Sequence, residues 1–437
     1  MPWRRQPAPE MRIDLAYGQG TLAIDLPAER TTVITPAPQS GLPDERAAVH
    51  AALARPIGAP PLREWVKPGA RVCIVFTDLT RATPNHRLIP WLLEHLGDVP
   101  RGHLTLLNST GTHRPNTRAE LEQMLTPAVV RNCRVVNHEC ENLADLVELG
   151  RTPDGAPVLL NRHLIDTDVR IITGFIEPHV FAGFSGGSKG LVPGCAGLAT
   201  VMSNHGARNL SHSRATFGIT AGNPLWEELR NIALRVGPSF LLNVTLNEPR
   251  QITGVFAGDL IVAHQAGCDF VRRSAMQVVP APFDLVITTN SGYPLDLNLY
   301  QGVKGMTAGA RIVRDGGLLI LACECREGVP AGSPYHRLLR QFPTPEALLA
   351  GLAQPGFCHA DQWQAYLQAL VQRRVRVLLH SSLSDEVARE VHLEPCHDIA
   401  TTAHDYLAGL GSHARVAVLP QGPLTIPCLE TSARFSA

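Results

Sequence analysis

The sequence lacks a net charge, C-x-x-C cysteine pairs, long apolar runs and, for the most part, aromatic side chains. Lysine plus arginine and aspartate plus glutamate number 39 each, so no overall field attracts nucleic acid or an anionic membrane. The ten cysteines include no C-x-x-C pair, which favours free thiols in a reducing compartment. No stretch is apolar enough to span a bilayer, and no apolar segment follows the charged start. We therefore expect a soluble, cytoplasmic protein with neither nucleic-acid nor membrane partners.

What the sequence does contain is a repeated order of elements. Aromatic residues make up 5% of the chain, while 37 glycines and 35 prolines supply turns, a composition typical of an α/β enzyme with many loops. Strands that alternate with helices form βαβ units and parallel sheets. Apolar runs that end in polar loops ahead of helical segments are residues 71–77, 103–108, 168–175 and 283–289.

The length of 437 residues suits two or three domains. We predict the fold class α/β, with two α/β domains, mainly parallel sheets and the active site in the cleft between them. Residues 11–270 would form an N-terminal α/β domain that carries the cofactor-binding loop. Residues 271–437 would form a C-terminal α/β domain that contributes substrate-binding residues and whose last residues can pack back on the first domain.

A glycine-rich loop follows the third of these runs and is the most informative stretch of the chain. Glycines permit positive φ and close backbone approach, so successive N–H groups can face one anion and bind a phosphate. The loop is not a Walker A motif, because Ser188 rather than glycine precedes Lys189. Helical spacing after Cys195 predicts a helix at the end of the loop. The loop glycines are Gly183, Gly186, Gly187, Gly190 and Gly194.

Side chains with useful chemistry come just after the predicted strands. Ligands of open α/β sheets bind beyond the carboxyl ends of strands, so these side chains are predicted to share one crevice. Structural alternatives remain open: a helix-capping Asp78 with a solvated Arg81, a turn histidine at position 113, and an exposed polar helix face for Gln301 and Lys304. The residues past strand ends are Asp78, Arg81, His113, Arg114, His179 and Lys189.

Taken together, these segments resemble the nickel-dependent lactate racemase family, the nickel-pincer nucleotide 2-hydroxy acid racemases and epimerases. The resemblance extends from about Met11 into the last domain and is most specific between Glu177 and His205. The segments that carry it are DLTRATP from Asp78, GTHR from Gly111, EPHVFAGFSGGSKGLVPG from Glu177, SNHG from Ser203 and NSGYPLDLNLYQGVKG from Asn290.

The resemblance implies a cofactor, nickel held in a pincer nucleotide (pyridinium-3-thioamide-5-thiocarboxylic acid mononucleotide). Lys189 matches the lysine that carries this group through a thioamide, and His205 matches the histidine that completes nickel coordination. His113 and His179 match the two general acid/base histidines. The other positions implied are cofactor contacts at Asp78, Arg81, Gly186 and Gly187, and substrate contacts at Gln301, Lys304 and Arg81.

The implied reaction is an isomerisation that inverts C2 of a 2-hydroxy acid by proton-coupled hydride transfer, through a bound 2-keto acid. A histidine with a pKa near neutrality suits removal of the hydroxyl proton, and a second one would return a proton on the opposite face. Imidazole and soft sulfur donors suit nickel, and the substrate carboxylate needs a cation such as Lys304 or Arg81. The implied partners are the substrate and the enzymes that make the cofactor, while the substrate's identity, racemase versus epimerase, and the oligomeric state stay open.

Two other functions use the same residues differently. In a pyridoxal-phosphate enzyme Lys189 would form the Schiff base beside a phosphate site, but His113 and His205 would then have no role. In a non-catalytic cofactor-binding relative, the lysine, the phosphate site and the nickel ligand would suffice. The histidine pair favours catalysis, because a protein that only binds the cofactor needs neither His113 nor His179.

Overall fold

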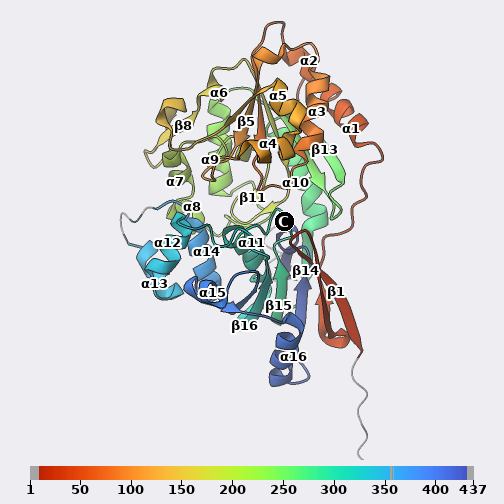
Figure 1. The fold of residues 1–437 in the computed structure, drawn as a ribbon, viewed down its shortest axis with the longest axis vertical. Coiled ribbons are helices and arrows are strands. Elements are labelled where there is room, and N and C mark those ends of the chain that lie inside the picture. The colour runs from red at the N-terminus through yellow and green to blue at the C-terminus, as the bar shows by residue number, and fades with distance from the viewer. Residues whose placement is uncertain (1–8, 355–356, 358, 431–437) are drawn as a thin grey trace, which may run out of the picture. The chain divides into compact units, whose positions relative to one another are not determined.

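The computed structural model describes residues 9–354, 357 and 359–430, which belong to two compact units (Figure 1). The N-terminal unit comprises residues 38–274, and the C-terminal unit comprises residues 1–37 together with residues 275–437 as far as they are described. Each unit is built on a six-stranded sheet. Within the described residues, no helix has both the length and the apolar composition needed to cross a membrane.

The sheet of the N-terminal unit is parallel except at one edge, where β13 runs antiparallel to β12. Its central strand β4 begins with VCIVF, five residues that are all buried, as a parallel strand covered on both faces requires. In sheet order the strands are β13 (Ile252–Asp259), β12 (Phe240–Leu246), β9 (Val169–Phe175), β4 (Val72–Thr77), β5 (Leu104–Ser109) and β6 (Arg134–Asn137).

Helices cover one face of this sheet, and the glycine-rich loop lies against the other. Ile74 and Ile171 face a core that these helices share, whereas Val75 and Ile172 point the opposite way and lie beside Gly190 of the loop, as strand alternation dictates. The helices on the first face are α1 (Glu45–Ala54), α2 (Leu62–Trp65), α3 (Asn85–His95), α4 (Arg118–Leu125) and α5 (Pro127–Asn132). The remaining elements of the unit are β7 (Leu146–Arg151), β8 (Pro157–Asn161), α6 (Arg162–Ile165), β10 (Pro178–His179), β11 (Gly183–Phe184), the 3-10 helix η4 (Gly187–Gly190), α7 (Leu198–Asn204), α8 (Ala207–Leu210), α9 (Pro224–Arg235) and α10 (Val262–Ala275).

The sheet of the C-terminal unit is parallel throughout. In sheet order its strands are β18 (Glu394–Pro395), β17 (Arg376–His380), β16 (Val313–Ala322), β15 (Phe283–Thr289), β19 (Val416–Leu419) and β3 (Thr31–Val33). Its helices are α11 (Leu299–Gly309), α12 (Pro334–Gln341), α13 (Pro345–Leu352), α14 (Gln362–Gln372), α15 (Asp385–Glu390) and α16 (Ile399–Leu410). Strands β14 (Met276–Val279) and β20 (Ile426–Leu429) pair in parallel and form a separate two-stranded sheet.

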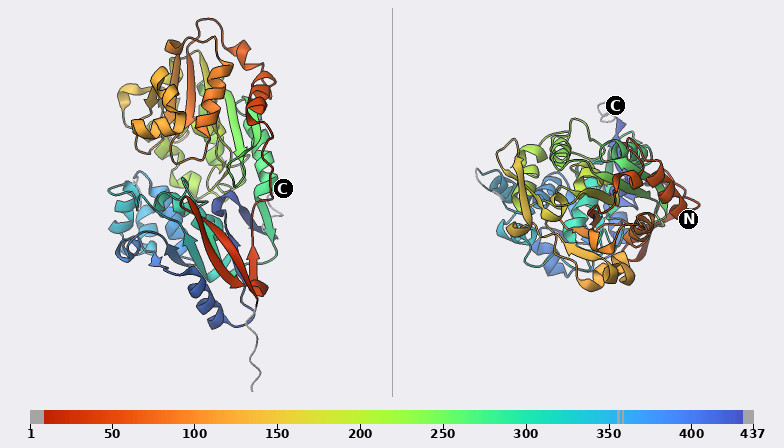
Figure 2. Two further views of the ribbon diagram at one scale, coloured as in Figure 1. Left: turned by 45° about the vertical axis from the view of Figure 1, so that its right-hand side comes forward. Right: turned by 90° about the horizontal axis from the view of Figure 1, so that it is seen from above.

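The N-terminal hairpin, β1 (Glu10–Tyr17) and β2 (Gly20–Pro27), belongs to the C-terminal unit, where it lies beside β15 (Figure 2). Its apolar side chains, among them Leu15 and Leu26, join α16 in the core over one sheet face. The Gly18 N–H donates to Asp296 Oδ2 at 2.7 Å, and β3 pairs with β19. This division differs from the expected placement of residues 11–37 in the N-terminal domain, because a hairpin buries its apolar face where a sheet is uncovered, whatever its position in the sequence.

The structure confirms the α/β class, the mainly parallel sheets and the expected strand, loop and helix order. The four expected strands correspond to β4, β5, β9 and β15. The helix expected after Cys195 is α7, but its first N–H, that of Leu198, donates to the Cys140 carbonyl at 2.9 Å. The beginning of α7 therefore offers that amide to no anion.

Candidate functional site

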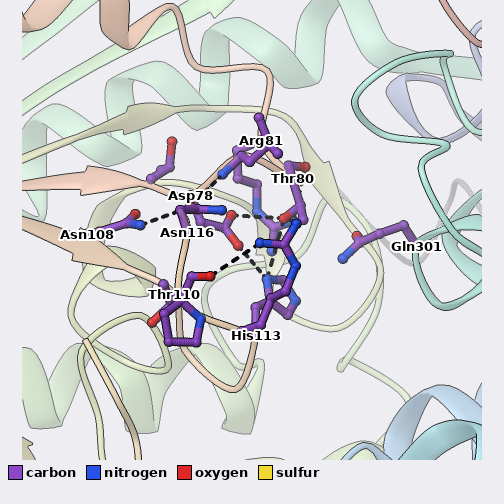
Figure 3. Close-up of polar contacts among 12 residues, drawn as sticks. Asp78, Thr80, Arg81, Asn108, Thr110, His113, Asn116 and Gln301 are labelled. Atoms are coloured by element: carbon purple, nitrogen blue, oxygen red, sulfur yellow. Dashed lines mark hydrogen bonds and ion pairs between the residues drawn. The ribbon is translucent and has the colours of Figure 1, made fainter. Parts of the chain in front are cut away.

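An aspartate and a histidine from neighbouring strands form the centre of the candidate site (Figure 3). Asp78 follows β4 and His113 lies in the loop after β5, and these strands pair in parallel up to Thr77 and Ser109. His113 Nδ1 and Asp78 Oδ2 are 2.6 Å apart. The Thr80 hydroxyl donates to the other carboxylate oxygen, Oδ1, at 2.8 Å. Both oxygens of Asp78 are thus engaged, which fixes the direction in which the carboxylate holds His113.

The electrostatics of this pair keep Asp78 ionised. Asp78 is only 3% exposed. Burial by itself raises its pKa, but the charge and hydrogen bond of His113, together with Arg81 and Thr80, outweigh burial and lower the pKa below its ordinary value. An ionised carboxylate can only accept, so Nδ1 of His113 carries the proton that is donated to it. The nitrogen of His113 with base character is therefore Nε2.

Arg81 is tied to the same loop and is not a solvated surface residue. Its Nη1 donates to the Thr80 hydroxyl at 3.0 Å, and the guanidinium is partly buried. The capping alternative for Asp78 does not hold, because α3 begins after Pro84 without a side-chain cap. The Asp78 side chain thus hydrogen-bonds His113 and does not cap α3.

Three asparagines, which sequence reasoning missed, brace the loops that carry Asp78 and His113. The Asn108 side-chain amide donates to Asn116 Oδ1 at 2.9 Å and to Asn137 Oδ1 at 2.8 Å. Asn116 Oδ1 also accepts from the Leu79 N–H at 3.3 Å. The only signal in the sequence was that Asn108 and Asn137 end apolar runs and that Asn116 follows the GTHR segment.

The glycine-rich loop is folded by contacts within the N-terminal unit. Gly186 and Gly187 have φ values of 80° and 56°, a region that favours glycine. The Gly187 N–H donates to Asn243 Oδ1 at 2.8 Å, so this amide is used inside the protein. The expectation that Gly186 and Gly187 bind the cofactor stays a prediction, and the structure gives Gly187 a packing role.

Replacing Gly187 by alanine is expected to lower the free energy of unfolding by about 1–3 kcal/mol. A Cβ at this position would lie 2.5 Å from Cγ of the buried His264, besides adopting an unfavourable φ. Denaturant unfolding measures the effect. Gly102→Ala is the matched control in the same unit, since a Cβ there meets nothing within 4 Å. Equal stability of the two variants would contradict this packing role.

His264, on α10, is another residue that the sequence did not reveal as part of the site. Its ring is 2% exposed, and Nε2 donates to the Ser185 carbonyl at 2.9 Å. Burial lowers its pKa to about 4, so the ring is neutral at physiological pH. Because Ser185 and Gly187 both lie against it, His264 supports the segment that leads into Lys189.

Lys189 lies in the loop, and the pKa of its amine is lowered well below the ordinary lysine value. Burial, reinforced by the charge of Arg81 and partly offset by Glu177, lowers the pKa of Lys189 to about 7. Part of the side chain remains accessible to solvent. About half of the amines are therefore neutral at pH 7, and a neutral amine is nucleophilic.

His205 follows α7 and is buried, with an exposed fraction of 5%. Burial and the nearby charge of Lys189 lower its pKa to about 3. The imidazole is thus neutral at physiological pH, which is the state that binds metal ions. The Phe181 ring connects it to His179, with ring centroids 6.2 Å from His205 and 6.5 Å from His179.

His179 lies in the short β10–β11 hairpin, opposite Gly183. Its Nδ1 accepts hydrogen bonds from the backbone N–H groups of Phe181 and Ala182, both at 3.2 Å. The ring is 9% exposed. The local backbone therefore holds this imidazole in one orientation.

The structure brings six of the predicted residues into one connected set within the N-terminal unit. Hydrogen bonds join His113 to Asp78, Asp78 to Thr80 and Thr80 to Arg81. The charge of Arg81 acts on Lys189, the charge of Lys189 acts on His205, and the Phe181 ring lies near both His205 and His179. These six residues are Asp78, Arg81, His113, His179, Lys189 and His205. Arg114, in contrast, pairs with Glu120, with Nη2 and Oε1 2.7 Å apart, at the start of α4.

Gln301 and Lys304 belong to the C-terminal unit. They lie on one face of α11, as predicted, and Lys304 Nζ donates to Gln301 Oε1 at 2.6 Å. Gln301 is buried and Lys304 is partly exposed, so this is not the fully exposed polar face that the structural alternative requires. Their contact with substrate stays a prediction.

Comparison with known proteins identifies the family. Residues 17–218 match the lactate racemase N-terminal domain, and residues 278–426 match the lactate racemase C-terminal domain. The chain is 34% identical to the lactate racemase of Lactiplantibacillus plantarum over 417 residues, which cover 94% of this chain and 98% of that protein. It is 31% identical to the lactate racemase of Thermoanaerobacterium thermosaccharolyticum over 418 residues, which cover 94% of this chain and 97% of that protein.

Solved structures agree with this comparison. The lactate racemase apoprotein from T. thermosaccharolyticum superimposes with a TM-score of 0.87, covering 95% of this chain and all of that chain at 31% identity. A Thermotoga maritima protein, 19% identical and with a TM-score of 0.70 over 90% of this chain, shares the fold. The chain belongs to the lactate racemase family of isomerases.

Proposed function

We propose that this racemase inverts C2 of a 2-hydroxy acid with the help of a nickel-pincer nucleotide carried on Lys189. The observation that carries the proposal is the enclosed Lys189 amine, whose pKa of about 7 leaves it reactive, next to the buried and neutral His205. The Asp78–His113 pair supplies a base in the same connected set. The substrate class follows the printed names of the relatives, which are lactate racemases.

The residues present fit such a cofactor. Among the described residues, no group of three or more histidine, cysteine, aspartate or glutamate side chains could hold a metal ion. A nickel ion at His205 would therefore take its other donors from a non-protein group, as a pincer nucleotide would provide them. Lys189 is one of three lysines in the chain, with Lys67 and Lys304, and Lys67 is exposed. The neutral amine beside a neutral imidazole suits a tethered ligand with one protein donor to the metal.

The chain's own residues supply the acid/base chemistry and the substrate contacts. When bound, the nucleotide would accept the C2 hydrogen with its electron pair and give it back. His113 takes the hydroxyl proton at Nε2, and Asp78 stabilises the resulting imidazolium through Nδ1. Arg81, held by Thr80, and Lys304, held by Gln301, are the cations proposed to bind the substrate carboxylate. The enzymes that make the cofactor are the further partners that this function requires.

The alternative of a pyridoxal-phosphate enzyme draws support from the same lysine, since a lowered pKa also favours Schiff-base formation. It gives no role to a buried neutral imidazole at His205 or to the Asp78–His113 pair. A non-catalytic cofactor-binding relative would likewise leave the Asp78–His113 pair without a use. The racemase proposal employs all of these groups.

The test is to produce the chain together with the cofactor-making enzymes and to measure intact mass and nickel content. Purified protein is then incubated with single enantiomers of lactate and of longer, aromatic and polyhydroxylated 2-hydroxy acids, followed by chiral analysis. An added mass on Lys189, about one nickel per chain and inversion of one substrate are expected. Protein without adduct and nickel, or a pyridoxal absorbance sensitive to borohydride, would overturn the proposal.

Replacing Lys304 by alanine is expected to raise KM by about 10–100-fold and to change kcat less, because a charge-assisted hydrogen bond to the carboxylate is lost in ground state and transition state alike. Steady-state kinetics with the substrate identified above measure this effect. Lys304→Arg, which keeps the charge, should recover part of the affinity, and Lys67→Ala is the matched control. An unchanged KM in Lys304→Ala would leave Arg81 as the carboxylate-binding residue.

A further inference from the structure

His138 follows β6 and carries a buried imidazole that the proposed reaction does not use. Its exposed fraction is 0%. Nε2 lies 3.0 Å from the Ala196 carbonyl oxygen, and Nδ1 lies 3.1 Å from Nδ2 of Asn161. Because a carbonyl oxygen can only accept, Nε2 carries the ring proton and Nδ1 accepts from Asn161. Burial lowers the pKa of His138 to about 4, so the ring is neutral at physiological pH and keeps both hydrogen bonds.

The backbone of His138 holds the loop that leads to His113. The His138 N–H donates to the Asn108 carbonyl at 3.1 Å, and the His138 carbonyl accepts from the Thr110 hydroxyl at 2.5 Å. The Thr110 carbonyl in turn accepts from the His113 N–H at 3.0 Å (Figure 3). Two hydrogen bonds through Thr110 therefore connect the main chain of His138 to that of His113.

Ala196, the acceptor for the His138 ring, belongs to the segment between Lys189 and His205. In this segment the Gly194 N–H donates to the Lys189 carbonyl at 3.2 Å, so the turn before Ala196 closes directly on the lysine. Helix α7 follows, and His205 comes directly after its last residue. The hydrogen bond from His138 to Ala196 therefore fixes this segment at a point between the two residues.

Two backbone hydrogen bonds support the same junction. The Gly111 N–H donates to the Gly194 carbonyl at 3.0 Å, and the Asn161 N–H donates to the Cys195 carbonyl at 2.9 Å. Neither bond uses the side chain of His138, so a substitution of His138 weakens the junction without removing it. We therefore expect a variant of His138 to fold and to show a local effect.

We propose that His138 is a positioning residue: its ring and backbone fix the segment that carries Lys189 and His205 against the loop that carries His113. This inference rests on the proposed function, in which these residues act on one substrate. A displacement of about 1 Å, caused by a change remote from the reacting atoms, can reduce a rate by about 10²-fold. His138 acts through the residues that it places, and its loss is expected to appear in kcat.

Two substitutions separate the contacts of the ring. Glutamine places an amide N–H near the position of Nε2, so His138→Gln keeps a donor for the Ala196 carbonyl. Asparagine places its amide oxygen near the position of Nδ1, so His138→Asn keeps an acceptor for Asn161 but does not reach Ala196. His95→Asn is the matched control, since His95 is a buried histidine of the same unit, 8% exposed, at the end of α3.

The first experiment uses the apoprotein and measures amide hydrogen exchange by mass spectrometry. His138→Asn is expected to exchange about 5–100-fold faster than the wild type in residues 109–113 and 189–198, because the buried Ala196 carbonyl loses its donor. Its exchange in β4 and β9 should stay unchanged, and His138→Gln and His95→Asn should match the wild type in both segments. Wild-type exchange of both segments in His138→Asn, or equally faster exchange of β4 and β9, would overturn the proposal.

The second experiment measures kcat and KM of the cofactor-loaded enzyme with the substrate that it inverts. His138→Asn is expected to lower kcat about 10–100-fold and to change KM less than about 3-fold, since the reacting groups are misplaced while the cations for the substrate carboxylate remain. His138→Gln should recover kcat to within about 5-fold of the wild type. Equal losses in the two variants, or a loss confined to KM, would contradict a positioning role through Ala196.

These measurements separate the positioning role of His138 from the proposed function. Intact mass and nickel content show whether each variant is loaded, so a loss of loading is not mistaken for a loss of placement. If loaded wild-type protein inverts no 2-hydroxy acid, the proposed function fails, and hydrogen exchange still decides whether His138 joins the two segments. If the wild type is active and His138→Asn matches it in exchange and in kcat, only the positioning role fails.

Discussion

Replacing Lys189 by methionine is expected to abolish both covalent cofactor loading and racemisation. Methionine fills a similar volume but offers no amine, so no tether can form. Intact-mass analysis and chiral analysis of protein produced with the cofactor-making enzymes measure the two losses. Since the chain has only three lysines, peptide mapping locates the adduct without ambiguity.

Lys67→Met is the control for this prediction, because Lys67 is exposed and should be dispensable. The pH dependence gives an independent check. The pKa of Lys189 is lowered to about 7, so its amine is cationic and unreactive below that value and neutral above it. Labelling of Lys189 by an acylating reagent in the apoprotein should therefore rise through about pH 7. An adduct that persists in Lys189→Met would place the tether elsewhere.

Replacing Asp78 by asparagine is expected to reduce kcat by about 10²–10⁴-fold in both directions. The amide of asparagine can donate to His113 Nδ1, which would move the ring proton to Nε2 and leave no base facing the substrate. Chiral assays in the two directions measure the effect, and His113→Ala should lose at least as much. The fold should be retained, because the asparagine brace around Asn108 holds the loops independently.

Asp154→Asn serves as the matched control, since Asp154 is an exposed aspartate of the same unit that pairs with Arg208. Surface ion pairs of this kind contribute little, so activity should be unchanged. The pKa of Asp78 is lowered, so its stabilising interaction with His113 is fully present above the ordinary aspartate pKa and is lost as the pH falls through the lowered pKa of the folded protein. An Asp78→Asn variant with wild-type kcat would mean that the carboxylate does not set the protonation of His113.

The positions of the strands and of the candidate residues were open to prediction because they depend on local pattern. Apolar runs of six to eight residues followed by polar loops placed β4, β5, β9 and β15 within a residue or two. The edge pair β12 and β13 was not predicted, since their apolar character gives no sign that β12 pairs with β9 on one side and with an antiparallel strand on the other. Which strands pair depends on how the faces of the whole sheet are buried, and the residues of a single strand do not determine it.

The contacts that give the site its chemistry join residues far apart in the sequence. Asp78 and His113 are separated by 35 positions and Gly187 and Asn243 by 56. Neither the brace of Asn108, Asn116 and Asn137 nor the support from His264 has a local signal. The hydrogen bond from the Gly187 N–H to Asn243 could not be predicted from the sequence either. A glycine-rich loop has a similar sequence whether its N–H groups face a ligand or other parts of the protein.

The sequence by itself determined the α/β class, the alternating order of strands, loops and helices, and the residue types that identify the family, because these are properties of short segments. Only the tertiary structure decided that the N-terminal hairpin joins the C-terminal unit, that burial lowers the pKa of Lys189 and His205, and that Asp78 holds His113. The physical reason is that burial, pKa and hydrogen-bond direction depend on which distant groups surround a side chain, and that is fixed only when the sheets and loops have come together.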